Sequence, residues 1–261
     1  MDRALFAAAS GMAAQQRNLD TIADNLSNAG VVGFKGSAQT FAELVAPGEG
    51  GLGTVALGAR VLFTQGKLAR SPGPFDLAID GPGFFALNDG SGRVFYSRDG
   101  QFARASDGTL RNAQDLRLTG IRIPSDALSA TVASDGSVRA TFTGGTRVIG
   151  HVRLAEFAAP ERLRAAGGAL FEATGESGPA RRVAPGAQHG PQLRFGMLEE
   201  SNVTIIEAMM QILAAQRAYE ANAKGVQTTR QRRRGVVSRR DGATKASSYL
   251  RSGQRCSPSE A

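Results

Sequence analysis

The sequence is poor in the side chains that metal sites and many enzymes use. Tryptophan is absent, and Cys256 is the only cysteine, so neither a disulfide framework nor a cysteine metal site can form. The only histidines, His151 and His189, are far apart in the sequence and fit no metal-ligand spacing. The sequence therefore predicts no metal site and no cofactor.

Patterns of catalytic groups are also missing. No nucleophile-elbow motif occurs, and the glycines at 48–53 are not followed by the Gly-Lys-Ser/Thr of a phosphate loop. Asp76 stands near Asp80 and Asp99, but the latter two each precede a glycine, where turn geometry explains an aspartate. We expect a protein that is not an enzyme, with no catalytic or cofactor-binding residues and no small-molecule substrate.

The net positive charge is concentrated at one end of the chain. Residues 230–261 contain nine basic and two acidic side chains, which accounts for +7 of the net charge of +8. A nearly neutral body has no general attraction to phosphate, so we expect no nucleic-acid partner. The basic segment keeps open a second class of function, an envelope binding module that uses this tail.

Long hydrophobic runs are absent too. No apolar stretch reaches about 18 residues, which excludes an ordinary transmembrane helix. The first residues lack the pattern of a Sec signal, because Asp2 offsets Arg3, and Ser10 and Gly11 interrupt a short apolar run. We expect that the chain, if it is exported, uses a route without a cleaved signal peptide.

Apolar residues recur at helical spacing near both ends. Leu5, Met12, Leu19 and Leu26 follow each other at seven-residue intervals, which predicts an N-terminal helix within residues 1–36.

A second helix is predicted at 200–229. Ile205, Ile212, Tyr219 and Val226 repeat the seven-residue interval, and the capping-box pattern that starts at Thr204 marks its beginning. We expect the two helices to pair as a coiled-coil-like domain, with apolar flanks left for neighbouring copies.

Between these helices the sequence changes to short runs of alternating apolar and polar residues, separated by turn residues. Asp-Gly pairs at 80–81, 89–90, 99–100, 107–108 and 135–136 punctuate about seven candidate strands. The sequence predicts an α+β protein with a central antiparallel β domain at 71–199. Residues 37–70, which include a glycine-rich stretch, are expected to form an extended linker.

Several motifs in this framework resemble the flagellar rod and hook proteins. They are residues 23–28 (ADNLSN) with 33–35 (GFK), residues 76–85 (DLAIDGPGFF), residues 96–102 (YSRDGQF), and the residue types of the last helix, including 216–222 (QRAYEAN). The resemblance covers about residues 1–229.

The resemblance implies a structural subunit of the basal-body rod, exported by the flagellar type III apparatus. Its partners would be copies of itself, neighbouring rod, hook and ring proteins, and the export apparatus, and its role would be to transmit torque. The residues at 123–128 and 216–222 favour the distal rod, and the start of the chain leaves the proximal rod as an alternative.

The helical pattern and the family motifs together predict a set of assembly-interface residues. The set comprises Leu5, Met12, Leu19, Ile22, Asn25, Leu26, Asn28, Gly33, Phe34, Asn202, Ile205, Met209, Ile212, Gln216, Tyr219 and Asn222.

The tail departs from the family pattern. Where the last helix of the family would continue with apolar residues, residues 230–261 are rich in Arg, Ser and Gly without periodicity. We expect either a disordered basic tail or the product of a reading-frame change near codon 230.

Overall fold

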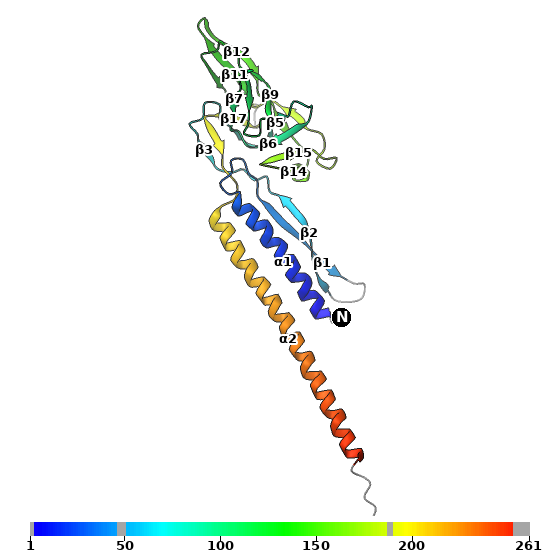
Figure 1. Ribbon diagram of the computed structural model, residues 1–261. Coiled ribbons are helices and arrows are strands. Elements are labelled where there is room, and N and C mark those ends of the chain that lie inside the picture. Colours follow the sequence, from blue (N-terminus) through cyan, green and yellow to red (C-terminus); the bar gives the residue numbers. More distant parts are fainter. Residues whose placement is uncertain (1–2, 46–50, 187–189, 253–261) are drawn as a thin grey trace, which may run out of the picture. The chain divides into compact units, whose positions relative to one another are not determined.

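In chain order, the strands follow one long helix and precede a second (Figure 1). The structure, a computed structural model, describes residues 3–45, 51–186 and 190–252. Helix α1 spans Arg3–Ser27, helix α2 spans Ile205–Ser252, and a 3₁₀ helix spans Pro160–Arg162. All the strand pairings described are antiparallel, which confirms the predicted α+β class.

In the described part of the chain, eighteen strands lie between the two helices in sequence order. They are β1 (Ser37–Val45), β2 (Gly51–Val61), β3 (Leu68–Arg70), β4 (Leu77–Asp80), β5 (Phe84–Asn88), β6 (Val94–Ser97), β7 (Ala103–Arg104), β8 (Thr109–Arg111), β9 (Arg117–Arg122), β10 (Ser129–Val132), β11 (Ser137–Phe142), β12 (Gly145–His151), β13 (Leu154–Glu156), β14 (Arg164–Gly167), β15 (Leu170–Glu172), β16 (Arg181–Val183), β17 (Gln192–Phe195) and β18 (Met197–Glu199).

The chain forms two compact units. The helical unit consists of Met1–Leu19, Thr40–Gly58 and Leu213–Ala261, and the sheet unit consists of Asp20–Gln39 and Ala59–Ile212.

In the helical unit, α1 contacts strand β2 and α2 closely. A hydrogen bond runs from the Thr54 amide to Ser10 Oγ at 3.2 Å. A Cβ added to Gly53 would lie 2.2 Å from the same oxygen, so only glycine permits this approach of the backbone. A Cβ on Gly11 would lie 3.0 Å from Asn222 Nδ2, which places α1 and α2 side by side at this point.

The segment expected to be a linker is more ordered than predicted. Residues 37–70 contain the two-stranded sheet β1-β2 and strand β3. The glycines that indicated a flexible linker instead allow β2 to lie close to a helix, as Gly53 shows.

The sheet unit is organised around a nine-stranded sheet. Its order is β14-β15-β6-β5-β9-β8-β7, with β13 joined to β5 and β16 joined to β13. Smaller sheets are formed by β10-β11-β12, by β17-β4 and by β18-β3. The turns predicted at the Asp-Gly pairs 107–108 and 135–136 are present, with φ of 81° at Gly108 and 80° at Gly136.

Strand alternation separates two hydrophobic clusters. Phe85, Leu87 and Leu154 belong to the larger cluster, and their strand neighbours Phe84 and Ala155 belong to the smaller one. Because successive side chains point to opposite faces of a strand, the two clusters cover opposite faces of the sheet. The smaller cluster is rich in aromatic rings in edge-to-face contact, as between Phe84 and Phe171.

Helix α2 begins close to the predicted position but is longer than expected. The residue before it, Thr204, donates its hydroxyl to Glu207 at 3.4 Å. The helical backbone continues to Ser252, whereas the sequence predicted a helix end at 229 followed by a disordered or frame-shifted tail. This stretch contains no proline and is rich in arginine, which favours helix, so helical propensity can extend it without an apolar repeat. Cys256 lies outside the described residues, as does His189.

Among the described residues, no helix is both long and apolar enough to cross a membrane.

Candidate functional site

Five polar residues from distant parts of the sequence form a polar junction in the sheet unit. They are Asn25, Lys35, Arg98, Glu199 and Asn202, and all except Asn202 are buried. The junction joins the end of α1 and the loop after it to the segment that leads into α2.

Gly33 begins the junction because it allows two segments to touch. Its amide donates to the Glu199 carbonyl oxygen at 2.7 Å, and its φ is 67°. A Cβ there would lie 2.3 Å from the Asp99 amide nitrogen, so any other residue would meet both a strained backbone and a clash. Close packing and a positive φ thus explain why the GFK motif begins with glycine.

Glu199 lies between two cations. Lys35 Nζ is 2.5 Å from Oε1, and Arg98 Nη1 is 3.2 Å from Oε2. The Gly66 amide also donates to Oε1 at 2.8 Å. The side chains of Lys35 and Glu199 have no exposed surface, so this is a fully desolvated ion cluster.

Further acceptors satisfy the two cations. Lys35 donates to the Thr64 carbonyl at 2.7 Å, and Arg98 donates to the Gly81 carbonyl at 2.8 Å while its guanidinium lies over the Phe84 ring. Burial lowers the pKa of Lys35 and the pKa of Arg98, and in both cases the charge of Glu199 opposes that effect. Arg98 Nε is buried without a hydrogen-bond partner, so the cluster is not fully satisfied.

The side-chain amides of the two asparagines each donate to a backbone carbonyl and accept from a backbone amide, as the backbone of a neighbouring strand would. Asn25 donates to the Ser37 carbonyl at 2.7 Å and accepts from the Ser37 amide at 2.8 Å. Asn202 accepts from the Gly36 amide at 2.8 Å and donates to the Leu62 carbonyl at 2.7 Å. These side chains therefore fix the loop after α1 and the entry to α2 to the same segments.

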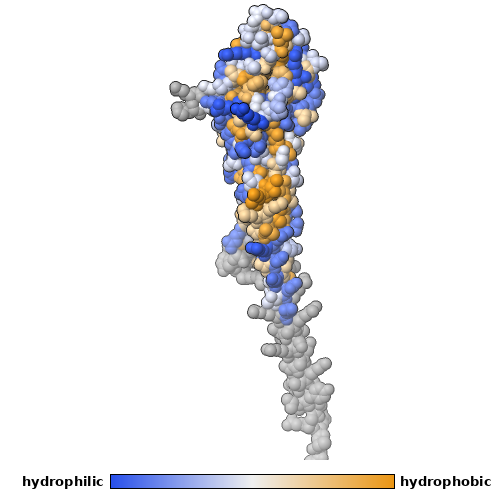
Figure 2. All heavy atoms as spheres, turned by 90° about the vertical axis from the view of Figure 1, so that its left-hand side faces the viewer, coloured by the Kyte–Doolittle hydropathy of each residue, from blue (hydrophilic) through white to orange (hydrophobic). Residues whose placement is uncertain are grey.

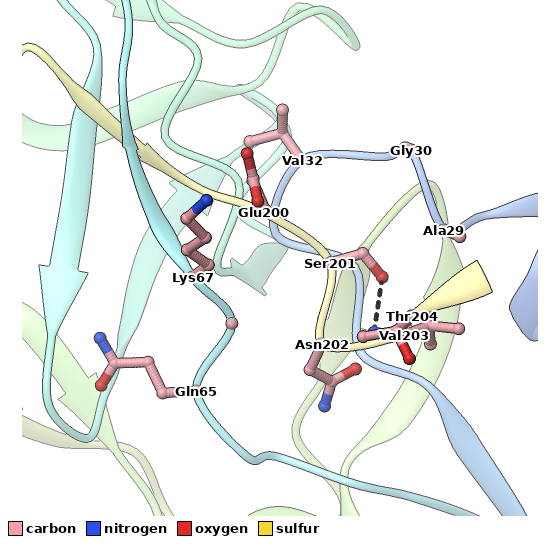
Figure 3. Close-up of a pocket in the computed structure, with 11 residues that line it drawn as sticks. Ala29, Gly30, Val32, Gln65, Lys67, Glu200, Ser201, Asn202, Val203 and Thr204 are labelled. Carbon is pink, nitrogen blue, oxygen red and sulfur yellow. Dashed lines mark hydrogen bonds between the residues drawn. The ribbon is translucent and has the colours of Figure 1, made fainter. Parts of the chain in front are cut away.

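A pocket of about 540 Å³ opens beside the junction (Figure 3). Loop residues 29–32 lie on one side and residues 200–204 on the other, and the Val203 amide donates to Ser201 Oγ at 3.1 Å. Its charged side chains, Lys67 and Glu200, are both exposed. It is an open hollow next to the start of α2, without a buried group that could act in catalysis.

The first turns of α2 carry an exposed apolar surface, which we call the α2 apolar face. Ile205, Ile206, Met209 and Met210 are 55%, 75%, 53% and 59% exposed. Figure 2 shows hydrophobic residues gathered on this side of the molecule. Large exposed apolar side chains clustered in this way are typical of interaction surfaces.

The small residues of α2 face inward instead. Ala208 in the sheet unit and Ala215 in the helical unit are 3% and 4% exposed, and they are seven residues apart on the helix. The inward register is therefore shifted from the predicted one, in which the larger apolar residues occupied the helix contact.

The predicted interface residues occupy three environments. Ile22, Asn25 and Gly33 are buried in the chain. Those of intermediate burial are Leu5, Met12, Leu19, Leu26, Asn28, Phe34, Asn202, Ile212 and Asn222. Those that are exposed are Ile205, Met209, Gln216 and Tyr219. Asn25, Gly33 and Asn202 come together in the junction, and Ile205 and Met209 share the α2 apolar face.

Sequence reasoning missed the roles of Lys35, Arg98 and Glu199. Lys35 and Arg98 stand in motifs quoted above and Glu199 precedes the last helix, but their contacts join residues up to 164 positions apart. No local pattern reports such a pairing.

We predict that Glu199→Ala strongly destabilises the sheet unit. The change leaves Lys35 and Arg98 buried without their counter-ion, which should cost about 3–5 kcal/mol of the free energy of unfolding. Urea denaturation followed by circular dichroism measures this. Glu200→Ala is the matched control, because that neighbouring carboxylate is exposed and should change stability by less than about 0.5 kcal/mol. Equal effects of the two changes would contradict the role assigned to Glu199.

The second prediction concerns Asp99, whose pKa is raised by burial and, to a smaller extent, by the nearby Asp76 charge. A carboxyl group with a raised folded-state pKa contributes stability that is present at low pH and is lost as pH rises through that pKa. Asp99→Asn keeps an oxygen that can accept the Gln101 amide bond and carries no charge. The stability of this variant relative to the wild type should therefore increase between about pH 3.5 and pH 7. Urea midpoints measured across this range test it, and a difference that stays constant would refute the interpretation.

Three family descriptions match segments of the chain. "Flagella basal body rod protein" matches residues 5–35, "Flagellar hook protein FlgE/F/G D1 domain" matches 78–140, and "Flagellar basal body rod FlgEFG protein C-terminal" matches 195–237. Of the five junction residues, Asn25 and Lys35 lie in the first matched segment, Arg98 lies in the second, and Glu199 and Asn202 lie in the third.

Relatives match over almost the whole chain. The flagellar basal-body rod protein FlgG of Borreliella burgdorferi is 37% identical over 252 residues, covering 88% of this chain and 95% of the relative. FlgG of Caulobacter vibrioides is 33% identical over 277 residues, covering 96% of this chain and 100% of the relative. The flagellar hook protein FlgE of Escherichia coli is 42% identical over 113 residues, covering 43% of this chain and 28% of the relative. Taken with the terminal helices and the central β region, these matches confirm the resemblance read from the motifs: the chain belongs to the flagellar basal-body rod protein family and is a structural subunit of the rod, not an enzyme.

Proposed function

We propose that this chain is a distal-rod subunit that polymerises through its terminal helices and transmits torque from the motor to the hook. The observation that carries the assembly mechanism is the α2 apolar face, where four large side chains are each more than half exposed. The distal position is supported by the FlgG relatives, which match along most of their length.

The chemistry of the α2 apolar face suits association with other copies. Burial of apolar area stabilises a contact by roughly 25 cal/mol per Å², and methionine side chains adapt to irregular neighbouring surfaces. A contact between this face and a different surface of the next copy would be heterologous, and such contacts build open helical filaments. A rod requires this kind of growth.

Pairing of the two helices belongs to the same proposal. In the helical unit, Gly11 of α1 lies against Asn222 of α2, and the small residues Ala14 of α1 and Ala215 of α2 are buried. Close approach of small residues leaves the larger side chains on the outer surface, where they are available to neighbouring subunits.

The junction suits a subunit that bears load. Within the sheet unit it ties the end of α1 and the start of α2 to the strands through buried ion pairs and side-chain-to-backbone hydrogen bonds. Buried polar networks of this kind define one geometry, because any displacement leaves charged groups without partners. Force applied to the helix ends would therefore reach the β region without loosening the chain.

We predict that the double variant Ile206→Asp with Met210→Asp abolishes rod assembly. The two positions are 75% and 59% exposed, so the free energy of unfolding of the monomer should change by less than about 1 kcal/mol. Charges placed in a buried contact between copies would prevent association. Electron microscopy of basal bodies from cells that express only the variant measures assembly. Gln227→Asp, at an exposed polar position of the same helix, is the control and should assemble normally. Complete rods in the double variant would rule out the α2 apolar face as the interface.

The rod position has its own test. Immunogold labelling of isolated basal bodies, with an antibody raised against residues 71–195, should place the label on the rod near the outer rings. Label near the inner-membrane ring would instead assign the chain to the proximal rod.

A further inference from the structure

The nine-stranded sheet contains a fork at Ala86. One edge of β5 pairs with β13 at Phe84 and Phe85, and with β9 at Leu87 and Asn88. Neither register includes Ala86, which is the point where the two strands diverge. The Thr119 hydroxyl donates to the Ala86 carbonyl at 3.0 Å and so replaces a ladder hydrogen bond there.

The fork opens into a pocket of about 400 Å³. Ala86 and Ala155 provide small side chains, and Gly120 provides none. His151, Arg153 and Arg182 line it as well, and all three are exposed. The pocket thus combines an inner surface of methyl groups with a cationic rim.

The two arginines line the same pocket. Arg182 is the direct partner of Ala155 across the β13–β16 ladder, beside the smaller hydrophobic cluster, and Arg153 directly precedes β13. Like charges that line one pocket repel each other, and an anion bound between them would relieve that repulsion.

Neither arginine has a carboxylate partner among the residues that the structure describes. The adjacent Arg181 does have one, because it pairs with Glu156 on β13. The charge of Arg182 also opposes the rise that burial causes in the pKa of Tyr96, so its field reaches the aromatic cluster under the sheet. An acidic group that pairs with these two arginines would come from outside these elements.

We propose that this pocket binds the carboxylate of an acidic side chain on a neighbouring protein chain. The planar guanidinium groups present paired donors that match the two oxygens of a carboxylate. The alanine methyl groups can contact the methylene groups of a glutamate, which a free anion lacks. This contact is separate from the α2 apolar face and would provide charge-selective recognition between chains in addition to helical association.

The experiment is a titration of the full-length, isotopically labelled chain, with the Nε–Hε signals of Arg153 and Arg182 followed by NMR. The probes are the capped tripeptide acetyl-Ala-Glu-Ala-amide, its glutamine counterpart, sodium acetate and inorganic phosphate, all at constant ionic strength. We expect saturable shifts with the glutamate peptide, and affinities for the other three probes that are lower by about tenfold or more, because a charged hydrogen-bonded pair or its methylene contacts are missing.

Variants test whether the pocket is responsible. Arg153→Gln and Arg182→Gln should each weaken binding of the glutamate peptide by about tenfold or more. Arg139→Gln, at an exposed arginine of β11, is the matched control and should leave binding unchanged. Since all three positions are exposed, urea midpoints should stay the same and exclude unfolding as the cause.

Three results would overturn the proposal. They are the absence of a saturable shift, an equal loss of binding in the Arg139→Gln control, and binding of acetate or phosphate as tight as that of the glutamate peptide. The last result would assign the pocket to a small anion instead of a protein side chain. None of these results depends on whether the chain assembles into a rod.

Discussion

The burial of the Glu199 carboxylate between Lys35 and Arg98 is the constraint on which the sheet unit depends. A desolvated carboxylate is costly, so the chain can adopt this fold only if the segments that carry both cations reach it. Replacing such a cluster by apolar residues often preserves stability, and its value lies more in defining one geometry than in net free energy. Here the geometry includes both helix ends, because Asn25 and Asn202 bind the same backbone segments that surround the ion cluster.

A second feature of the structure is the choice of side chains that α2 buries within the chain. Within each unit the inward positions of α2 are alanines, whereas isoleucine and methionine of the α2 apolar face remain exposed. A chain built to stay alone would bury these residues, since each is worth about 1.5–3 kcal/mol when removed from water. In the assembly proposed above the opposite arrangement is useful, because burial of this exposed area between copies would favour polymerisation.

Several exposed arginines of the β region are paired with carboxylates. Arg162, Arg164, Arg181 and Arg194 each lie within ion-pair distance of a carboxylate of the same unit. Exposed pairs of this kind contribute little stability but neutralise the surface. Arg153 and Arg182 at the fork of β5 have no ion pair among the described residues, and both line one pocket together with small side chains. Their shared place in that pocket is the basis for proposing that it has a role between chains.

Much of the architecture could be read from the sequence by itself. Seven-residue periodicity gave both helices, alternation with Asp-Gly turns gave strands such as β5, β6 and β11, and family motifs gave the rod assignment that the relatives confirm. These features are local, so a short window of residues is enough to determine them. The tertiary structure decided the inward register of α2, the strands within 37–70, the helical backbone beyond 229, and the meeting of Lys35, Arg98 and Glu199. These outcomes depend on which surfaces approach one another and how closely, and a one-dimensional pattern carries no information about contacts between residues 164 positions apart.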